Sequence, residues 1–145
     1  MSDKRAVPRG SQYVSFDGSG LTLLLVDDHE SSRLSLERLL LRRGFKVIQS
    51  DTVRGGLSAL ARHRIDILLA DIGLPDGSGY ELLEKIDPKA PMASIALTGF
   101  GTVQDLEMSR KAGFSIHLTK PIRMEALDTA LGEALQQLRS KGRLG

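Results

Sequence analysis

Cysteine and tryptophan are both absent from the 145 residues. A chain without thiols cannot form disulfide scaffolds, zinc–thiolate sites or cysteine nucleophiles, so any metal must be held by oxygen or histidine. Aromatic residues make up only 4% of the sequence, and the core must therefore consist mainly of Leu, Ile, Val and Ala. A helix that crosses a bilayer needs about 20 apolar residues, and every apolar run in the sequence is much shorter. Residues 1–10 also contain no apolar segment of the kind found in secretory signals. We expect a cytoplasmic protein without membrane insertion.

Positive charge is concentrated near the two ends of the chain. The formal net charge is +2, but residues 21–135 carry a slightly negative balance, whereas Arg139, Lys141 and Arg143 make the C-terminus basic. Basic ends without interleaved aromatic side chains are typical of solvated tails rather than of a nucleic-acid footprint. Direct binding of nucleic acid is therefore not expected.

The length suits one domain with a full hydrophobic core. Residues 1–20 are rich in Ser, Gly and Pro and lack periodicity, which predicts a flexible lead-in. Within them, the stretch 7–11 has the pattern of a protease-site remnant and equally that of a natural linker. We predict a folded domain over 21–138 and a basic tail over 139–145.

Short apolar runs alternate with helical patterns along the predicted domain. The apolar runs are too short for stable helices and are typical of strands buried on both faces. The expected strands are 23–26, 45–49, 65–70, 92–97 and 114–118, and the expected helices are 34–41, 53–61, 80–86, 103–112 and 124–138. Gly44 is expected to end the first helix, and Ser50 or Asp51 to cap the second. Five such units predict an α/β fold with a doubly wound, mostly parallel sheet.

Polar residues follow the ends of the predicted strands. Asp27 and Asp28 come after the first strand, Asp71 after the third, Thr98 after the fourth and Lys120 after the fifth. These ends converge in a parallel sheet, where three carboxylates repel one another unless positive charge compensates. Mg²⁺, which prefers hard oxygen ligands, and a lysine would do so. One carboxylate could then attack phosphorus to give an aspartyl phosphate.

Four motifs in order carry a family resemblance. They are Val26-Asp27-Asp28, the loop from Asp71 to Gly77, Leu97-Thr98-Gly99, and Leu118-Thr119-Lys120-Pro121-Ile122. Together they resemble the receiver (response regulator) domain of two-component signal transduction systems, from Leu21 to about Leu138. The resemblance implies a flavodoxin-like fold with five helices and a five-stranded parallel sheet in the order 2-1-3-4-5.

The resemblance also implies roles for the acidic residues. Asp71 would be the phosphoacceptor, because it precedes the Gly-Leu-Pro-Asp-Gly loop. Asp28 would bind Mg²⁺ directly, and Asp27 would do so directly or through water. Asp71 and the backbone carbonyl of Gly73 would complete the protein ligands of the metal.

Four further residues would take part in the switch. Lys120 would pair with the phosphoryl group, and the Thr98 hydroxyl would hydrogen-bond to a phosphoryl oxygen. His117 stands where the family usually has an aromatic residue whose rotation follows the threonine, so the surface read by partners is expected to differ. Phe100 lies where it could shield the site from water.

A receiver of this kind is expected to be a switch rather than an enzyme, with catalysis limited to its own phosphorylation and slow dephosphorylation. The phosphoryl donor would be a sensor histidine kinase or a histidine phosphotransfer domain. Output would come through a partner protein at the surface formed by the fourth helix, fifth strand and fifth helix. A single-domain regulator and the receiver of a hybrid sensor histidine kinase are both compatible with the tails.

Three alternative interpretations remain open. Asp27 and Asp28 could simply cap the first helix. The fold could serve as an interaction module that is independent of phosphorylation. A small aspartyl-phosphate hydrolase is a weaker alternative, because Asp27-Asp28-His29-Glu30 does not match the Asp-x-Asp pattern of haloacid dehalogenase-type enzymes.

Overall fold

The computed structural model describes residues 18–87, 89–99 and 103–142, without the side chains of 103–106. Its main sheet has five parallel strands in the order β2-β1-β3-β6-β7. They are β1 (Thr22–Val26), β2 (Lys46–Ser50), β3 (Ile67–Asp71), β6 (Ala93–Thr98) and β7 (Ile116–Thr119). This confirms the predicted order 2-1-3-4-5.

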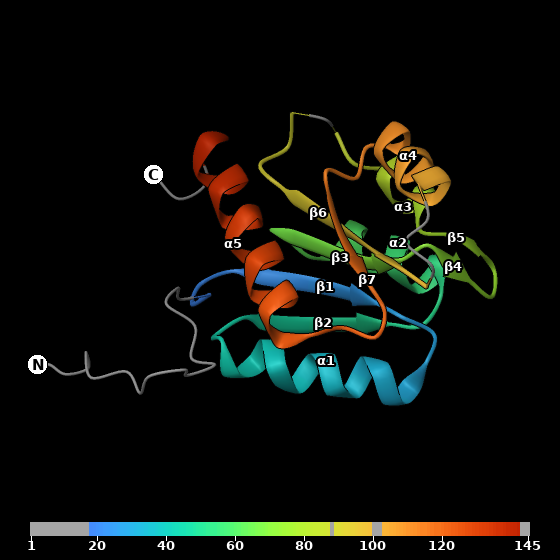
Figure 1. Cartoon of the computed structure of the whole chain (residues 1–145). Coiled ribbons are helices and arrows are strands. Elements are labelled where there is room, and N and C mark those ends of the chain that lie inside the picture. The colour runs from blue at the N-terminus through green and yellow to red at the C-terminus, as the bar shows by residue number, and fades with distance from the viewer. Residues whose placement is uncertain (1–17, 88, 100–102, 143–145) are drawn as a thin grey trace, which may run out of the picture.

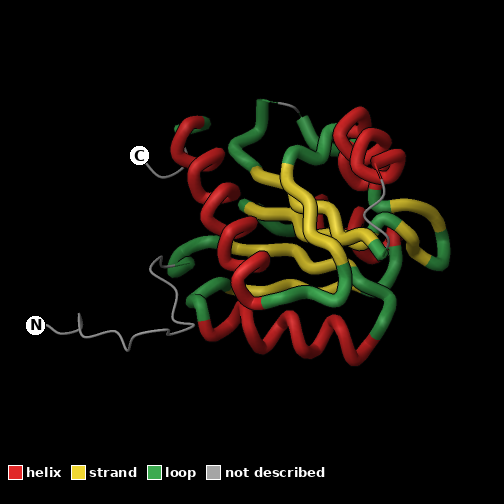
Figure 2. The backbone as a smooth tube through the Cα atoms, viewed as in Figure 1, coloured by secondary structure: helices red, strands yellow, loops and turns green. Residues whose placement is uncertain are grey.

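In the part of the chain that the structure describes, five helices cover the two faces of the sheet (Figures 1 and 2). They are α1 (Glu30–Arg42), α2 (Val53–Arg62), α3 (Tyr80–Leu83), α4 (Val103–Ala112) and α5 (Met124–Ser140). The helices α1 and α5 lie on one face, whereas α2, α3 and α4 lie on the other. No helix in the described ranges is both long enough and apolar enough to span a membrane.

The core consists of two apolar clusters, one on each face of the sheet. Strand side chains point alternately to opposite faces. In β1, Leu23 and Leu25 pack with residues of α1 and α5, whereas Leu24 and Val26 pack with residues of α2 and α3, and all four are fully buried. Burial on both faces explains why the central strands are almost continuously apolar in sequence.

The prediction for the cap of α2 was wrong. Thr52, not Ser50 or Asp51, occupies the N-cap position, and its side chain accepts a hydrogen bond of 2.9 Å from the Gly55 amide. The Ser50 hydroxyl instead bonds to the Thr52 carbonyl oxygen. Ser50 is the last residue of β2, so the chain needs two more residues before it can turn into the helix.

A second cap for α2 comes from a distant segment. The predicted loop after β3 forms a small antiparallel pair, β4 (Gly73–Leu74) and β5 (Gly77–Ser78), with Asp76 at its turn. The Asp76 carboxylate accepts hydrogen bonds of 2.7 and 3.0 Å from the amides of Val53 and Arg54. These two bonds lower the pKa of Asp76. They tie the loop beside the candidate site to the start of α2.

Several helix ends differ from the predictions. The helix expected over 34–41 begins four residues earlier, at Glu30. The third helix ends at Leu83, and the chain continues to Ile86 in turns rather than in the expected helix. At the other extreme, α5 continues to Ser140, beyond the last apolar position at Leu138. Gly44 follows the end of α1 with a φ of 93°, a conformation that glycine adopts at little cost.

Candidate functional site

The predicted polar residues meet at the carboxyl edge of the sheet. Asp27 follows β1, Asp71 and Thr98 are the last residues of β3 and β6, and Lys120 follows β7. The strand register places these ends side by side, and the Lys120 amide donates a 2.8 Å hydrogen bond to the Thr98 carbonyl. Asp71, Thr98, Lys120 and His29 line one cavity of about 310 Å³.

Lys120 connects the two buried carboxylates of the site. Its Nζ lies 2.8 Å from Asp71 Oδ2 and 3.2 Å from Asp27 Oδ1. Burial alone would lower the pKa of Lys120, but the hydrogen bonds and negative charges of Asp71 and Asp27 outweigh it and raise that pKa. The lysine therefore stays protonated at neutral pH. The Lys120–Pro121 peptide bond is cis.

The two buried aspartates have pKa values shifted in opposite directions. Burial raises the pKa of Asp71 above its ordinary value, and the charge of Asp27 adds to this effect, although Lys120 opposes it. Burial also acts on Asp27, but bonds from the His29 amide, the Ser32 hydroxyl and Lys120 outweigh it and lower the pKa. Asp27 is thus held as a charged anchor, whereas the charge on Asp71 is less well compensated.

The helix-cap interpretation of the two aspartates disagrees with this geometry. His29, not an aspartate, is the N-cap residue of α1, and its side chain makes no capping hydrogen bond. Asp27 Oδ1 accepts from the His29 amide at 3.0 Å, and Asp27 Oδ2 accepts from the Ser32 hydroxyl at 2.7 Å. Asp27 therefore organises the turn before α1, and Asp28 stays exposed beside it.

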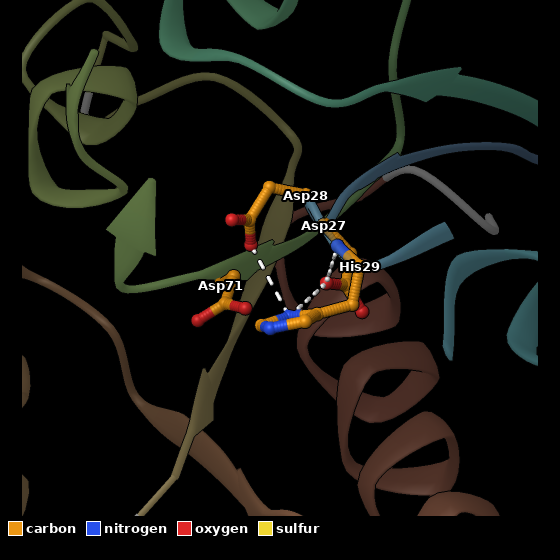
Figure 3. Close-up of side chains that lie close together, drawn as sticks. All are labelled: Asp27, Asp28, His29 and Asp71. Atoms are coloured by element: carbon orange, nitrogen blue, oxygen red, sulfur yellow. Dashed lines mark hydrogen bonds and ion pairs between the residues drawn. The ribbon is translucent and has the colours of Figure 1, made fainter. Parts of the chain in front are cut away.

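His29 lines the cavity although its position in the sequence does not by itself assign it a role. Figure 3 shows its ring beside Asp71, with dashed lines from one ring nitrogen to Asp27 and to Asp28. Its Nδ1 lies 3.3 Å from Asp28 Oδ1 and 3.5 Å from Asp27 Oδ1. The only signal in the sequence was its position directly after the aspartate pair, in the turn that joins β1 to α1.

The acidic cluster has the donor set that a divalent cation requires. One ligand atom from each of Asp27, Asp28, His29 and Asp71 lies within 4.8 Å of the others. The cluster has three carboxylates, and the Lys120 ammonium group pairs with those of Asp27 and Asp71, so the carboxylates outnumber the lysine. Carboxylate oxygens are the ligands that Mg²⁺ prefers, and the residues present therefore fit this ion.

Thr98 and Gly73 also lie at the cavity. Thr98 is 5% exposed, and its hydroxyl has no hydrogen-bond partner among the described residues. The Gly73 amide donates to Asp71 Oδ1 at 3.3 Å. The nearby Gly79 packs against β3, where a Cβ would collide with the Asp71 carbonyl oxygen. Phe100 lies outside the described residues.

His117 lies on β7, away from the cavity, and pairs in register with Ala96 of β6. Paired residues of neighbouring strands share a face of the sheet, and Ala96 and Thr98 are two residues apart along β6. His117 and Thr98 therefore lie on the same side of the sheet. The His117 Nε2 is buried and has no hydrogen-bond partner in the described part of the chain. Burial, together with the charge of Arg110, lowers the pKa of His117.

Comparison with known protein families agrees with this geometry. Residues 23–132 match the response regulator receiver domain family. The chain belongs to this family. It is a receiver domain with the fold that the resemblance implied, and its cluster of aspartates is compatible with phosphoacceptor signalling.

Two relatives and one solved structure illustrate the similarity of this receiver domain to known proteins. It is 34% identical over 122 residues to the photosynthetic apparatus regulatory protein RegA of Rhodobacter capsulatus, covering 81% of this chain and 66% of RegA. It is 31% identical over 118 residues to the transcriptional regulatory protein GlrR of Escherichia coli, covering 79% of this chain but only 26% of GlrR. The crystal structure of a CheY-like receiver domain protein from Methanospirillum hungatei is 28% identical, with a TM-score of 0.73, and the match covers 86% of this chain and 98% of that one.

Proposed function

We propose that Asp71 accepts a phosphoryl group from a phosphohistidine of a sensor histidine kinase or a histidine phosphotransfer domain. The main support is the position of Asp71 at the end of β3, in a cavity that also contains Lys120 at 2.8 Å and a Thr98 hydroxyl for which the described residues offer no partner. A carboxylate with raised pKa and incompletely compensated charge, next to a lysine, is typical of a reactive site. The predicted receiver unit is 21–138.

In the proposed step, an oxygen of the Asp71 carboxylate forms a bond to phosphorus, and the bond from phosphorus to the donor histidine nitrogen breaks. The histidine nitrogen leaves with the bonding electron pair. Lys120 pairs with the phosphoryl oxygens from its place between Asp71 and Asp27. Mg²⁺, held by Asp28, Asp27, Asp71 and the Gly73 carbonyl, would supply charge neutralisation for the phosphoryl group.

The modified site would act as a switch through Thr98. Its buried hydroxyl, which has no partner among the described residues, can donate to a phosphoryl oxygen once that oxygen is present. The phosphoryl group would thereby favour one conformation at the end of β6 from an existing equilibrium. His117 and the surface of α4, β7 and α5 would then change their affinity for an output partner protein.

The test is the mass of the intact protein after incubation with Mg²⁺ and a small phosphodonor. We expect an increase of about 80 Da, the mass of one phosphoryl group, in the wild type. The Asp71→Asn variant, which is nearly isosteric, and a wild-type sample with EDTA should both lack this increase. Unaltered labelling of Asp71→Asn would remove Asp71 from the proposed role.

Each alternative function predicts a different result. An interaction module independent of phosphorylation would bind its partner equally as wild type and as Asp71→Asn, with or without Mg²⁺. A hydrolase would release phosphate steadily from phosphoesters. If no small donor labels the protein, transfer from a phosphorylated histidine phosphotransfer domain is measured in the same way.

A further inference from the structure

The acidic cluster of this receiver domain contains a nitrogen donor as well as oxygen donors. His29 Nδ1 lies 3.3 Å from Asp28 Oδ1 and 3.5 Å from Asp27 Oδ1, and its side chain is 69% exposed. Figure 3 shows one ring nitrogen of His29 directed toward the carboxylates of Asp27 and Asp28. The side chain therefore lies at the opening of the site, with its Nδ1 directed toward the two carboxylates.

The spacing of these atoms suits ligands of one cation. Two ligands at right angles around an ion with bonds of about 2.1 Å are about 3.0 Å apart. The separations from His29 Nδ1 to the two carboxylate oxygens are only slightly longer. A small rotation of the imidazole ring would bring the nitrogen into the same coordination sphere as the oxygens.

The backbone holds His29 in this position. Its amide donates a 3.0 Å hydrogen bond to Asp27 Oδ1, and Asp27 is itself fully buried. The His29 carbonyl begins the hydrogen bonding of α1 by accepting from the Arg33 amide at 2.8 Å. Both bonds fix the backbone from which the imidazole projects, so only the side-chain torsions of His29 are left to order when its nitrogen binds an ion.

The cavity has an independent feature that points to a bound polar ligand. His29 and Thr98 line the same cavity, and the 5% exposed Thr98 has a buried hydroxyl without a partner in the described part of the chain. A buried hydroxyl without a partner is costly, which favours a cavity that takes up an oxyanion together with its cation. The acidic cluster is thus part of a built site and not a chance grouping on the surface.

We propose that His29 Nδ1 is a metal ligand, and that it gives this site a preference for first-row transition dications over Mg²⁺. Mg²⁺ gains little from an imidazole, whereas divalent transition ions bind nitrogen donors increasingly well along the series from Mn²⁺ to Cu²⁺. This inference rests on the proposed cation site, and it adds a specificity-determining residue to that site.

The experiment compares the affinities of Mg²⁺ and Co²⁺ by isothermal titration calorimetry at one fixed pH. The wild-type chain of 145 residues is compared with His29→Asn, which replaces the imidazole by a small amide. His63→Asn is the matched control, because His63 is an exposed histidine at the C-cap of α2, at the opposite edge of the sheet. A fourth protein, Asp28→Asn, locates the bound ion.

We expect His29→Asn to weaken Co²⁺ binding by about tenfold or more, comparable with the loss of a supporting group in a metal site, and to leave Mg²⁺ binding nearly unchanged. The visible absorption of bound Co²⁺ should also move to longer wavelength, because an oxygen or water replaces nitrogen. His63→Asn should bind both ions with wild-type affinity, and Asp28→Asn should bind both ions more weakly.

Three results would overturn the inference. An equal ratio of Co²⁺ to Mg²⁺ affinity in wild type and His29→Asn, with Mg²⁺ still bound, would reject His29 as a ligand and leave the proposed function standing. Strong Co²⁺ binding in Asp28→Asn would place the ion elsewhere. Absence of binding by either ion in the wild type would reject the cation site itself, and with it the Mg²⁺ dependence of the proposed function.

Discussion

Replacing Lys120 by Met tests whether one ammonium group compensates the two buried carboxylates. Methionine has a similar length and is apolar, so it can occupy the space of the lysine stem without its charge. The wild-type Nζ lies 2.8 Å from Asp71 Oδ2 and 3.2 Å from Asp27 Oδ1. Lys120→Met would leave Asp27, which is fully buried, and Asp71, whose side chain is 11% exposed, without their cation.

The size of the effect follows from distance and burial. At these separations each ion pair amounts to about 5–6 kcal/mol of direct attraction at an effective dielectric constant of about 20. Much of this attraction is offset by the cost of removing the lysine from water. Breaking a buried pair from one side costs about 3–5 kcal/mol, and the 21% exposure of the Lys120 side chain reduces our expectation to about 2–3 kcal/mol.

The assay is urea denaturation of the metal-free protein, followed by far-UV circular dichroism because the chain has no Trp. With an m-value of about 2 kcal/mol/M, the midpoint should fall by about 1–1.5 M without a change in m. Lys85→Met is the control, since Lys85 is exposed and its loss should change stability by less than about 0.5 kcal/mol.

Mg²⁺ should stabilise Lys120→Met more than it stabilises the wild type, because the cation replaces the missing positive charge. The double variant Lys120→Met/Asp71→Asn should be more stable than Lys120→Met alone, since one unpaired carboxylate is removed. If Lys120→Met and Lys85→Met have the same midpoint in metal-free buffer, the bridge between the carboxylates contributes nothing and the reasoning is refuted.

Three further predictions concern packing and pH. Burial lowers the folded-state pKa of His117 below 6.5, so the unfolded chain binds more protons, and wild-type stability should fall as the pH drops below about 6.5. His117→Phe should lose less stability than the wild type between pH 8 and 5 in thermal denaturation. Equal slopes of stability against pH for the two proteins would contradict this. Gly79→Ala should destabilise the fold because its Cβ would collide with the backbone carbonyl at the end of β3, whereas Gly132→Ala in α5 meets nothing within 4 Å and should stabilise by up to about 1 kcal/mol in urea titrations. Leu40→Ala should lower the free energy of unfolding by about 2–5 kcal/mol because Leu40 is fully buried. Leu41→Ala should lower it by less than about 1 kcal/mol because Leu41 is 51% exposed. Equal losses of stability in the two variants would contradict the packing of α1.

Local patterns predicted the sheet because each buried strand is a short apolar run that ends in a polar residue. The run Leu23 to Val26 is continuous because neighbours on both faces bury it, and Asp27 follows where the strand reaches the open edge. The same logic placed Asp71, Thr98 and Lys120 at that edge. Parallel strands bring these ends together whatever the details of the loops.

Local patterns predicted helix ends less well. The prediction of the N-cap of α2 was wrong because Ser50 is still part of β2. A second cap comes from Asp76, which lies far away in the sequence. The Asp76 carboxylate bonds to amides more than 20 positions earlier in the chain, and no periodicity connects them. Likewise, buried Arg43 at the end of α1 pairs with Asp128 of α5 at 2.6 Å, which no pattern within either helix indicates.

The sequence by itself determined which segments form strands and which form helices. It also determined the edge of the sheet at which the site lies and most of the residues that approach one another there. These properties follow from the order of apolar and polar residues along the chain. Only the tertiary structure decided that Lys120 is shared between Asp27 and Asp71, that the pKa values of these aspartates move in opposite directions, and that His29 faces the cluster. Charge compensation depends on distance and burial in three dimensions, and these are set by contacts between residues far apart in the chain.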